Sequence, residues 1–458
     1  LSATGGTNGS AVSVFSFDEV VLDGRAVVDG SATASLTLNH ESTLSAAEVS
    51  VVHGTVYTNG RVSVNAGKVN LTSTGSFDGK GRSTYSSAKG PGTPDTSGCT
   101  WSTGDYSRDR AASHGGLGGY TSGQCAYGST FYPVTEGSGG HGGLGGAALR
   151  LSVSGELLLD GKVTMDASDA STDWSGGSGG SAWISAGVLR GSGGVVSADG
   201  GERSRYGSAG GGGGRIALYC SSSSYGSVGG HSLSLPSLHA YGGNGADDSW
   251  DGGCGTVYID CGDASKTLLL DNADRDTTPQ LTTLVDEGMT TYAFDSVHMI
   301  GKPRLGFAPT QTGSAAVTVS IGSASGDTSG TVVAAPFTGR TQRVVVVLSG
   351  HVGGKAFVSD SHYQASGVSS SSSLSLETHW TRLYYLSEVN VLSALNVEVS
   401  AGSELVAPPR LVVQGCSLSL AGTVRGVKEL SIVDGGSVAL SATGGTDGQL
   451  NGTFSFDE

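Results

Sequence analysis

Short stretches in which apolar and polar residues alternate recur along the chain. The clearest run lies between residues 396 and 440, where alternating apolar pairs return about every 20 residues: Val397/Val399, Leu418/Leu420 and Val438/Leu440, with Leu411/Val413 and Leu430/Ile432 between them. An alternation of period two is typical of a β-strand with one buried face. The pattern therefore predicts two interleaved sets of short strands, each strand followed by an equivalent one at a fixed interval.

The spacing of these strands predicts the fold class. Strands that recur at a fixed interval, separated by Gly, Asp and Asn, are typical of a parallel β-helix (β-solenoid), in which each strand lies beside its equivalent in the next coil. A β-sandwich would also contain many short strands, but nothing in that fold maintains a fixed interval. Helices are not expected, because the chain has 78 glycines and no long window of apolar residues at helical spacing. We therefore predict an all-β protein with the parallel β-helix fold.

Glycine clusters mark the middle of the chain. The last glycines of three clusters, Gly146, Gly180 and Gly214, are 34 residues apart, and each precedes an alternating strand, as does Gly255. Glycine can adopt positive φ and allows neighbouring backbones to approach closely, so tight corners between coils are predicted here, with protruding loops between the clusters. A phosphate-binding loop is the alternative at 210–214, but no GxxxxGK[ST] motif and no helical pattern accompany it.

The two ends of the sequence are nearly the same. Residues 1–19 and 440–458 match at 13 of 19 positions, with an offset of 440 − 1 = 439 residues. We predict that the chain holds one period of a longer tandem array, cut just inside the next copy. The residues expected to stack at the seam between copies are Leu1, Phe15, Phe17, Val438, Leu440, Phe454 and Phe456.

The same patterns divide the chain into six segments. They are β-helix coils in 1–75, a loop-rich insertion in 76–134, glycine-rich β-helix repeats in 135–262, further coils with loops in 263–395, coils of about 20 residues in 396–439, and the start of the next repeat in 440–458. No charged-then-apolar leader opens the sequence, so a signal peptide is expected either to be cleaved or to lie outside this stretch.

Charge and hydropathy argue against nucleic acid binding and against a membrane-spanning segment. The net charge is −15 and no cluster of Lys and Arg is present, so nucleic acid binding is not expected. No run of about 18 apolar residues occurs, so no membrane-spanning segment is expected either.

Three motifs in the middle of the chain resemble a known kind of repeat. GGSGGSAWISAGVLRGSGGVVSADGG, GSAGGGGGRIALYC and GGCGTVYID are similar to the glycine-rich parallel β-helix repeats of very large cell-surface and extracellular proteins of protists, algae and some bacteria. The resemblance covers residues 135–262, and the flanking segments resemble general parallel β-helices more loosely. It implies a secreted, surface-exposed protein and carries no catalytic residue to this chain.

The six cysteines are an even number, without a CxxC motif or a Cys/His pair at zinc spacing. Disulfides are therefore favoured over a metal site. The disulfide candidates are Cys99, Cys125, Cys220, Cys254 and Cys261. Cys99 with Cys125 is the first pairing expected, because both lie in a stretch with little apolar material. Cys416 lies in an alternating strand and is the best candidate for a buried thiol.

Glycans are expected at two kinds of site. Three N-glycosylation sequons occur, at Asn8, Asn70 and Asn451, and each would be a site only in a secreted protein. Serine runs at 221–224 and 369–373 are predicted to be exposed loops, with O-glycosylation as the alternative interpretation.

Carboxylates gather in two places. The residues are Asp166, Asp169 and Asp173 in DASDASTD, and Asp247, Asp248 and Asp251 in DDSWDGG. Polysaccharide-active β-helices place such carboxylates in one groove, often with calcium. Aspartate also caps turns through its own side chain, and neither run matches a known calcium-binding repeat. We predict no enzyme activity and no cofactor, with calcium as the alternative.

The histidines and tryptophans also have two interpretations. His114 and His141 share the sequence HGGLGG, which fits turn geometry better than a proton relay. Trp101, Trp174 and Trp250 lie in polar stretches, where they would either stack on sugars or anchor loops.

A structural role is expected from these features. An exposed strand edge pairs with another strand, so a tandem repeat would stack on itself head to tail. The predicted protein is a glycan-bearing subunit of an extracellular filament or surface appendage, formed by coaxial stacking of β-helical repeats. Two alternatives stay open: an adhesin or carbohydrate-binding stalk, and a polysaccharide-active enzyme.

Overall fold

The structure is a computed structural model in which every described element is a strand, apart from one residue of 3-10 helix at Trp250. This confirms the all-β prediction. Contacts divide the chain into two compact units, Leu1–Ala264 with Arg275–Thr282 and Ser265–Asp274 with Thr283–Glu458. The structure describes residues 13–23, 34–93, 111–119, 126–171, 174–204, 208–225, 236–246, 250–262, 266–275, 280–284, 286, 289, 291–307, 317–327, 329–334, 344–348, 389–392, 396–399, 404–407 and 409–440.

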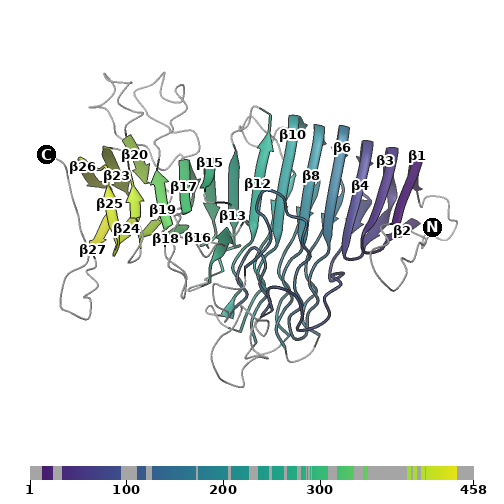
Figure 1. Ribbon diagram of the computed structural model, residues 1–458, viewed down its shortest axis with the longest axis horizontal. Coiled ribbons are helices and arrows are strands. Elements are labelled where there is room, and N and C mark those ends of the chain that lie inside the picture. Colours follow the sequence, from purple (N-terminus) through teal and green to yellow (C-terminus); the bar gives the residue numbers. More distant parts are fainter. Residues whose placement is uncertain are drawn as a thin grey trace. The chain divides into compact units, whose positions relative to one another are not determined.

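Seven long strands of the first unit lie side by side in a parallel ladder (Figure 1). In spatial order they are β1 (Ser13–Asp23), β3 (Ser42–Thr58), β4 (Arg61–Leu71), β6 (Ala148–Leu159), β8 (Ser181–Gly191), β10 (Arg215–Tyr225) and β12 (Thr256–Cys261). A second parallel ladder of shorter strands joins it through β3: β2 (Ala34–Leu38), β5 (Gly75–Asp78), β7 (Lys162–Thr164), β9 (Val195–Ser197) and β11 (Ser237–His239).

Apolar residues at alternating positions of these strands form the core of the first unit. Leu44, Val64, Leu151, Ile184 and Leu218 are in register across five neighbouring strands, and all are buried. Each such side chain contributes about 1.5–3 kcal/mol on leaving water. The intervening residues point to the other face of the sheet, because successive side chains of a strand alternate.

The second unit contains shorter strands in three groups. One parallel ladder holds β13 (Thr267–Asp271), β15 (Thr291–Ile300), β17 (Val317–Gly326), β19 (Val344–Leu348), β22 (Glu404–Val406) and β25 (Thr423–Arg425). A six-stranded sheet holds β14 (Thr282–Leu284), β16 (Arg304–Phe307), β18 (Thr331–Ala334), β21 (Asn396–Val399), β24 (Ser417–Leu420) and β27 (Ser437–Leu440). A three-stranded sheet holds β20 (Val389–Leu392), β23 (Arg410–Gln414) and β26 (Glu429–Val433).

Between residues 396 and 440, strands that are about 20 residues apart in sequence lie next to each other as parallel pairs. Val397 pairs with Leu418, and Leu418 pairs with Val438, in adjacent strands of the six-stranded sheet. Leu411 likewise pairs with Leu430 in the three-stranded sheet. The predicted neighbours are therefore confirmed here.

The prediction of a parallel β-helix with glycine-rich corners is nevertheless wrong as a fold class. The strands β1 to β12 all belong to one sheet, so the first unit does not show the separate faces of regular coils. The reason is strand length. The 17 residues of β3 pair first with β1 and β4 and then with β2 and β5, without a corner between the two ladders.

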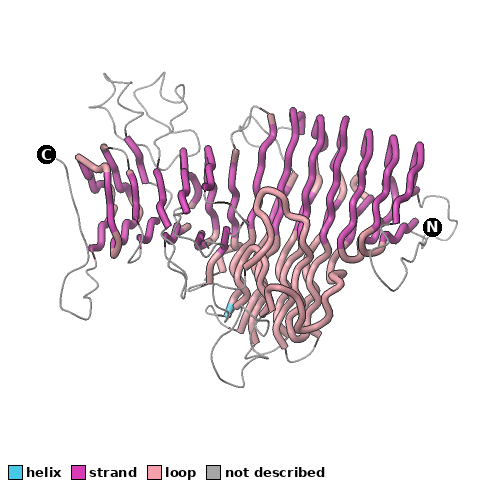
Figure 2. Tube along the Cα trace, viewed as in Figure 1, coloured by secondary structure: helices cyan, strands magenta, loops and turns pink. Residues whose placement is uncertain are grey.

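The glycine clusters contain no glycine with positive φ, and only 137–146 folds back on itself, at the bend 141–143, so they are not the predicted corners between coils. Residues 137–146, 176–180, 210–214, 242–245 and 252–255 form what we call the glycine bundle, and they contain no strand and no glycine with positive φ. Figure 2 shows the bundle among the loops gathered below the long strands of the first unit.

Hydrogen bonds in the glycine bundle return to the same neighbour every third residue. Gly210 N and Gly213 N donate to Trp250 O and Gly253 O (3.0 and 2.9 Å). Gly211 N and Gly214 N donate to Gly201 O and Ala198 O (2.9 and 2.7 Å), and Gly212 N donates to Ala112 O (2.9 Å). A chain with three residues per turn and no internal hydrogen bonds is a polyproline II helix, so 176–180, 210–214 and 252–255 are segments of that type. Residues 137–146 instead fold back on themselves, with Gly137 N and Gly140 N donating to Gly146 O and Gly143 O (both 2.9 Å).

Glycine is required in the bundle for close approach. A Cβ placed on Gly211 would overlap the carbonyl oxygen of Gly177, and one on Gly255 would overlap that of Gly214. Most glycines of the bundle are buried, and the bonds between segments satisfy their amides. Close backbone approach was predicted correctly for these clusters, whereas the corner geometry was not.

Candidate functional site

The exposed strand edges are the first candidate site. Within the described residues, β1 pairs only with β3, so its other side presents unpaired backbone groups. In the second unit, β25, β26 and β27 each end a row of parallel strands and have one described partner strand, namely β22, β23 and β24. Such edges are templates for pairing with a further strand.

Apolar side chains are exposed on these same strands. Phe17 and Val21 on β1 are 38% and 51% exposed, and Leu440 on β27 is 61% exposed. With Ile432 and Val433 on β26, they make five of the seven large apolar side chains that are exposed in the described part of the chain. Exposed apolar side chains on a strand edge favour an interaction surface at that edge.

The predicted seam residues are placed only in part. Phe17 lies on β1, and Val438 and Leu440 lie on β27, as described above. Phe15 also belongs to β1, but its side chain is outside the described set. Leu1, Phe454 and Phe456 lie outside the described residues.

A cluster of titratable groups lies where β7, β9 and β11 end. Asp166 Oδ1 accepts a hydrogen bond from Asp199 N (2.8 Å), and His239 Nδ1 lies 3.0 Å from both carboxylate oxygens of Asp199. Tyr241 N donates to Asp199 Oδ1 (2.7 Å), and its ring stacks on that of His239 with centroids 4.7 Å apart. Burial and the nearby Asp199 carboxylate raise the pKa of Asp166 to about 6. The cluster can therefore hold a proton near neutral pH.

The remaining predicted carboxylates do not join this cluster. Asp169 Oδ1 accepts from Glu202 N (3.1 Å), and buried Asp251 accepts from Gly245 N (2.5 Å), so both cap backbone as the turn interpretation expects. Asp173, Asp247 and Asp248 lie outside the described residues. Among the described residues, no group of three or more His, Cys, Asp or Glu is placed to hold a metal ion.

His114 lies in a buried polar cluster against the glycine bundle. Its Nδ1 is 2.7 Å from Gly179 O and its Nε2 is 2.9 Å from Thr135 Oγ1, while its ring stacks on Tyr127. Burial and the nearby Arg215 guanidinium lower the pKa of His114 to about 3, so the ring is neutral at physiological pH. Arg215 is fully buried, and its Nε donates to Tyr127 O (2.9 Å). This cluster connects loops to strands and is closed to a substrate.

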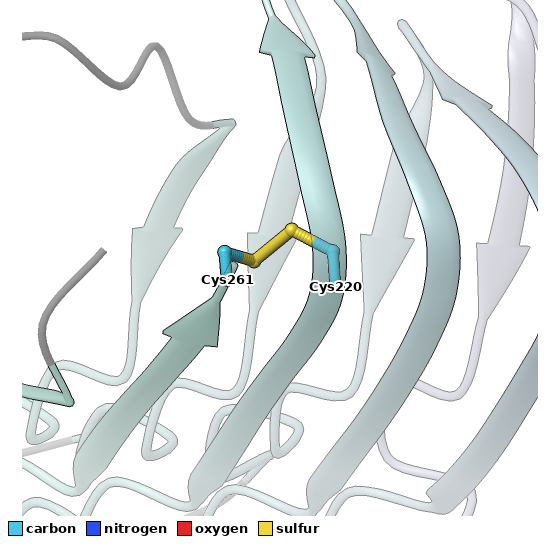
Figure 3. Close-up of a disulfide and its surroundings, with 2 residues drawn as sticks. All are labelled: Cys220 and Cys261. Carbon is cyan, nitrogen blue, oxygen red and sulfur yellow. A yellow bond between two sulfur atoms is a disulfide. The ribbon is translucent and has the colours of Figure 1, made fainter. Parts of the chain in front are cut away.

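The structure describes four of the six cysteines, namely Cys220, Cys254, Cys261 and Cys416. Cys220 on β10 and Cys261 on β12 are opposite each other in the parallel register and form a disulfide (Figure 3). The bond closes a loop of 41 residues, which corresponds to about 4 kcal/mol of stabilisation in a chain-entropy model. Cys254, a disulfide candidate, is instead a buried thiol 3.0 Å from Thr282 Oγ1. Cys416 is a buried thiol, as predicted, and burial raises its pKa to about 11. Cys99 and Cys125 lie outside the described residues.

The predicted glycan and sugar-binding residues lie in different surroundings. Asn70 is in the middle of β4, between β3 and β6, and its Oδ1 is buried. Asn8 and Asn451, like Trp101, lie outside the described residues. Trp174 stacks on His141 with centroids 5.4 Å apart, which is the loop-anchoring arrangement. Trp250 is half-buried, and its carbonyl accepts a bond from the glycine bundle.

A groove on the first unit involves residues that the sequence did not single out. Arg150 and Trp183 are paired in register on β6 and β8, and Tyr132 packs against Trp183. The available signal was that both Arg150 and Trp183 occupy the outward position of an alternating strand just after a glycine cluster. The position of Tyr132 depends on how a long loop folds back, which no local pattern shows.

Comparison with known proteins gives no relative. No family model matches the chain, and no curated protein or solved structure matches it significantly. In the part of the chain that the structure describes, no helix has the length and apolar character needed to cross a membrane. The resemblance to extracellular glycine-rich repeats stays a prediction.

Proposed function

We propose that this protein is a structural subunit of an extracellular filament or surface appendage, in which copies join end to end by pairing of their strand edges. The observation that carries the proposal is the pair of edges described above, which present both unpaired backbone and exposed apolar side chains. The Cys220–Cys261 disulfide supports an oxidising, extracellular location.

The match between residues 1–19 and 440–458 indicates which residues of one copy would take equivalent positions in the next. With the offset of 439 residues, Phe17 corresponds to Phe456, and the start of β1 at Ser13 corresponds to Gly452. A segment equivalent to β1 would therefore follow β27 directly in a tandem array. In the proposed filament, β1 of one copy pairs with β25 of the copy before it, and the joining copy also covers the exposed apolar residues of β26 and β27.

Electron microscopy of edge variants tests this function. Phe17→Lys and Leu440→Lys place a charge on exposed residues of the two edges, so they should keep the fold and abolish filaments. Leu144→Lys is the matched control, because Leu144 is also 38% exposed but lies on neither edge, and it should still assemble. A wild-type chain that stays monomeric at all concentrations, or edge variants that assemble like the wild type, would contradict the proposal.

The native mass distinguishes two forms of the filament. A covalent array predicts that the denatured, reduced native protein has a mass many times 45.6 kDa. A mass near that of one copy would mean that separate chains stack, and the edge variants would then remove all assembly.

A further inference from the structure

A groove of about 320 Å³ lies on the outward face of the large sheet in the first unit. Its floor is formed by outward residues of three neighbouring strands, Thr43 on β3, Ser63 on β4 and Arg150 on β6, and Glu41, Arg61 and Tyr132 line its sides. This volume lies in the lower part of the range for small-molecule sites, about 300–1,000 Å³, which suits a small organic group such as a sugar ring.

One wall of the groove is a loop that the sheet holds in place. Ser129 Oγ accepts hydrogen bonds from Phe131 N (3.2 Å) and Tyr132 N (2.9 Å). Tyr219 OH donates to Phe131 O (2.7 Å), and the Phe131 ring packs edge-on against Tyr258. These contacts fix the loop over β10 and β12, so the groove is already formed without a ligand.

Tyr132 is held at this wall while its side chain stays available. Its ring meets Trp183 edge-on with centroids 5.3 Å apart, yet Tyr132 is 46% exposed. An aromatic ring that is fixed on one side and open on the other is suited to stacking on the apolar face of a sugar.

The two arginines of the groove differ in their partners. Arg61 is neutralised by Glu41, at 2.5 Å from its NH2 to Oε1, and lies near buried Glu136. Arg150 has no carboxylate partner among the described residues. Its NH1 donates to Asn65 Oδ1 at 3.4 Å, its guanidinium lies 5.2 Å from the Trp183 ring centre, and its buried Nε has no hydrogen-bond partner in the described structure. The groove therefore contains one cation without a counter-charge.

We infer that this groove binds a carboxylate-bearing sugar, such as a uronate unit of an acidic polysaccharide. The Arg150 guanidinium pairs with the carboxylate, which is the ligand geometry that arginine favours. Tyr132 stacks on the ring, and the hydroxyls of Thr43 and Ser63 bond to the sugar hydroxyls. A nucleic acid is disfavoured, because binding a run of phosphates needs several clustered cations, whereas this groove offers one unpaired arginine, which suits a single carboxylate.

The groove is separate from the edges used in the proposed filament. Its residues lie on β3, β4 and β6, at Glu41 just before β3, and on the loop that carries Tyr132, whereas the joining residues lie on β1 and β25 to β27. The inference therefore holds for a single copy. In a filament the groove would recur once per copy, so an acidic polysaccharide would bind to several grooves at once with increased avidity.

Calorimetric titration with hexagalacturonate, and with cellohexaose as the neutral probe, tests the inference. Wild-type protein should bind the uronate and not the neutral oligomer, with affinity falling as salt rises. Arg150→Gln and Tyr132→Ala should each weaken binding about tenfold or more. Arg190→Gln is the matched control, because Arg190 is an outward arginine on β8 that already pairs with Glu156 (2.6 Å), and it should bind like the wild type.

Each other outcome overturns a stated part of the inference. Equal binding of both oligomers, unaffected by Arg150→Gln, would exclude recognition of the carboxylate. Absence of uronate binding at millimolar concentration would exclude the site. Thermal unfolding of each variant checks the fold, and Tyr132→Ala keeps the test valid if Arg150→Gln is unstable, because Tyr132 is exposed.

Discussion

The long strands and the glycine bundle of the first unit are stabilised in opposite ways. In the strands, every second side chain is apolar and buried, as with Leu151 between Val64 and Ile184. In the bundle, the buried positions are mostly glycine, and backbone hydrogen bonds to three neighbours take the place of side-chain packing.

The two regions differ because each follows its own sequence period, and each period produces a different kind of core. The strands follow a period of two, which produces a buried apolar face. The bundle follows a period of three, which is the repeat of a polyproline II helix. The two regions should therefore respond to opposite changes, because strands are weakened by removing atoms and the bundle by adding them.

Truncation in the strand core should have the largest effect. Leu151→Ala is expected to lower the free energy of unfolding by about 2–5 kcal/mol, because it removes buried methyl groups and leaves a cavity. Ser152→Ala, on the next residue and the opposite face, should change it by no more than about 0.5 kcal/mol. Chemical denaturation of both variants measures the two free energies of unfolding. Equal losses would contradict the assignment of Leu151 to a buried core.

Addition of one methyl group in the bundle should have the next largest effect. Gly211→Ala is expected to cost about 1–3 kcal/mol, since the new Cβ meets the Gly177 carbonyl and the backbone has to shift. Gly193→Ala is the control, because a Cβ there meets nothing within 4 Å. If both variants melt at the wild-type temperature, the bundle is not closely packed.

Acid should weaken the bundle through His114. Its folded pKa of about 3 lies below the ordinary 6.5, so its contribution to stability is complete above about pH 6.5 and is lost as the pH falls towards 3. Between about pH 6 and pH 4 the expected loss is at most about 1.4 kcal/mol per pH unit.

Asp166 acts in the opposite direction: its raised pKa stabilises the fold below about pH 4, and this contribution disappears as the pH rises through about 6.

His114→Gln isolates the first contribution. The variant retains the Asp166 effect, so subtracting its unfolding free energies from those of the wild type across pH 4–7 leaves the His114 term. If the free energy of unfolding of the wild type and of His114→Gln fell equally with decreasing pH, protonation of His114 would not destabilise the fold.

Part of this fold could be predicted from the sequence, because strand pairing in it follows local patterns. The interval between Val397, Leu418 and Val438 gave the correct parallel neighbours. The strand after each glycine cluster was also predicted, since β6, β8, β10 and β12 follow Gly146, Gly180, Gly214 and Gly255.

The remaining features depend on a period or on contacts that the strand and helix patterns do not include. The triplets X-Gly-Gly, with X at Ser138, His141 and Leu144, have a period of three, which differs from the period of 2 of strands and of 3.6 of helices. The β-helix prediction failed because alternation shows where strands are, and does not show that the 17 residues of β3 continue from one ladder into the other without a corner. The Cys220–Cys261 bond and the Tyr132–Arg150 groove bring together residues far apart in sequence.

Electron cryomicroscopy of a protein carrying two consecutive copies tests the proposed joining most directly. We expect β1 of the second copy to lie parallel to β25 of the first, at the strand spacing of about 4.7–4.9 Å and hydrogen-bonded along the three residues of β25. A seam in which the second β1 has no strand neighbour from the first copy would contradict end-to-end assembly by edge pairing.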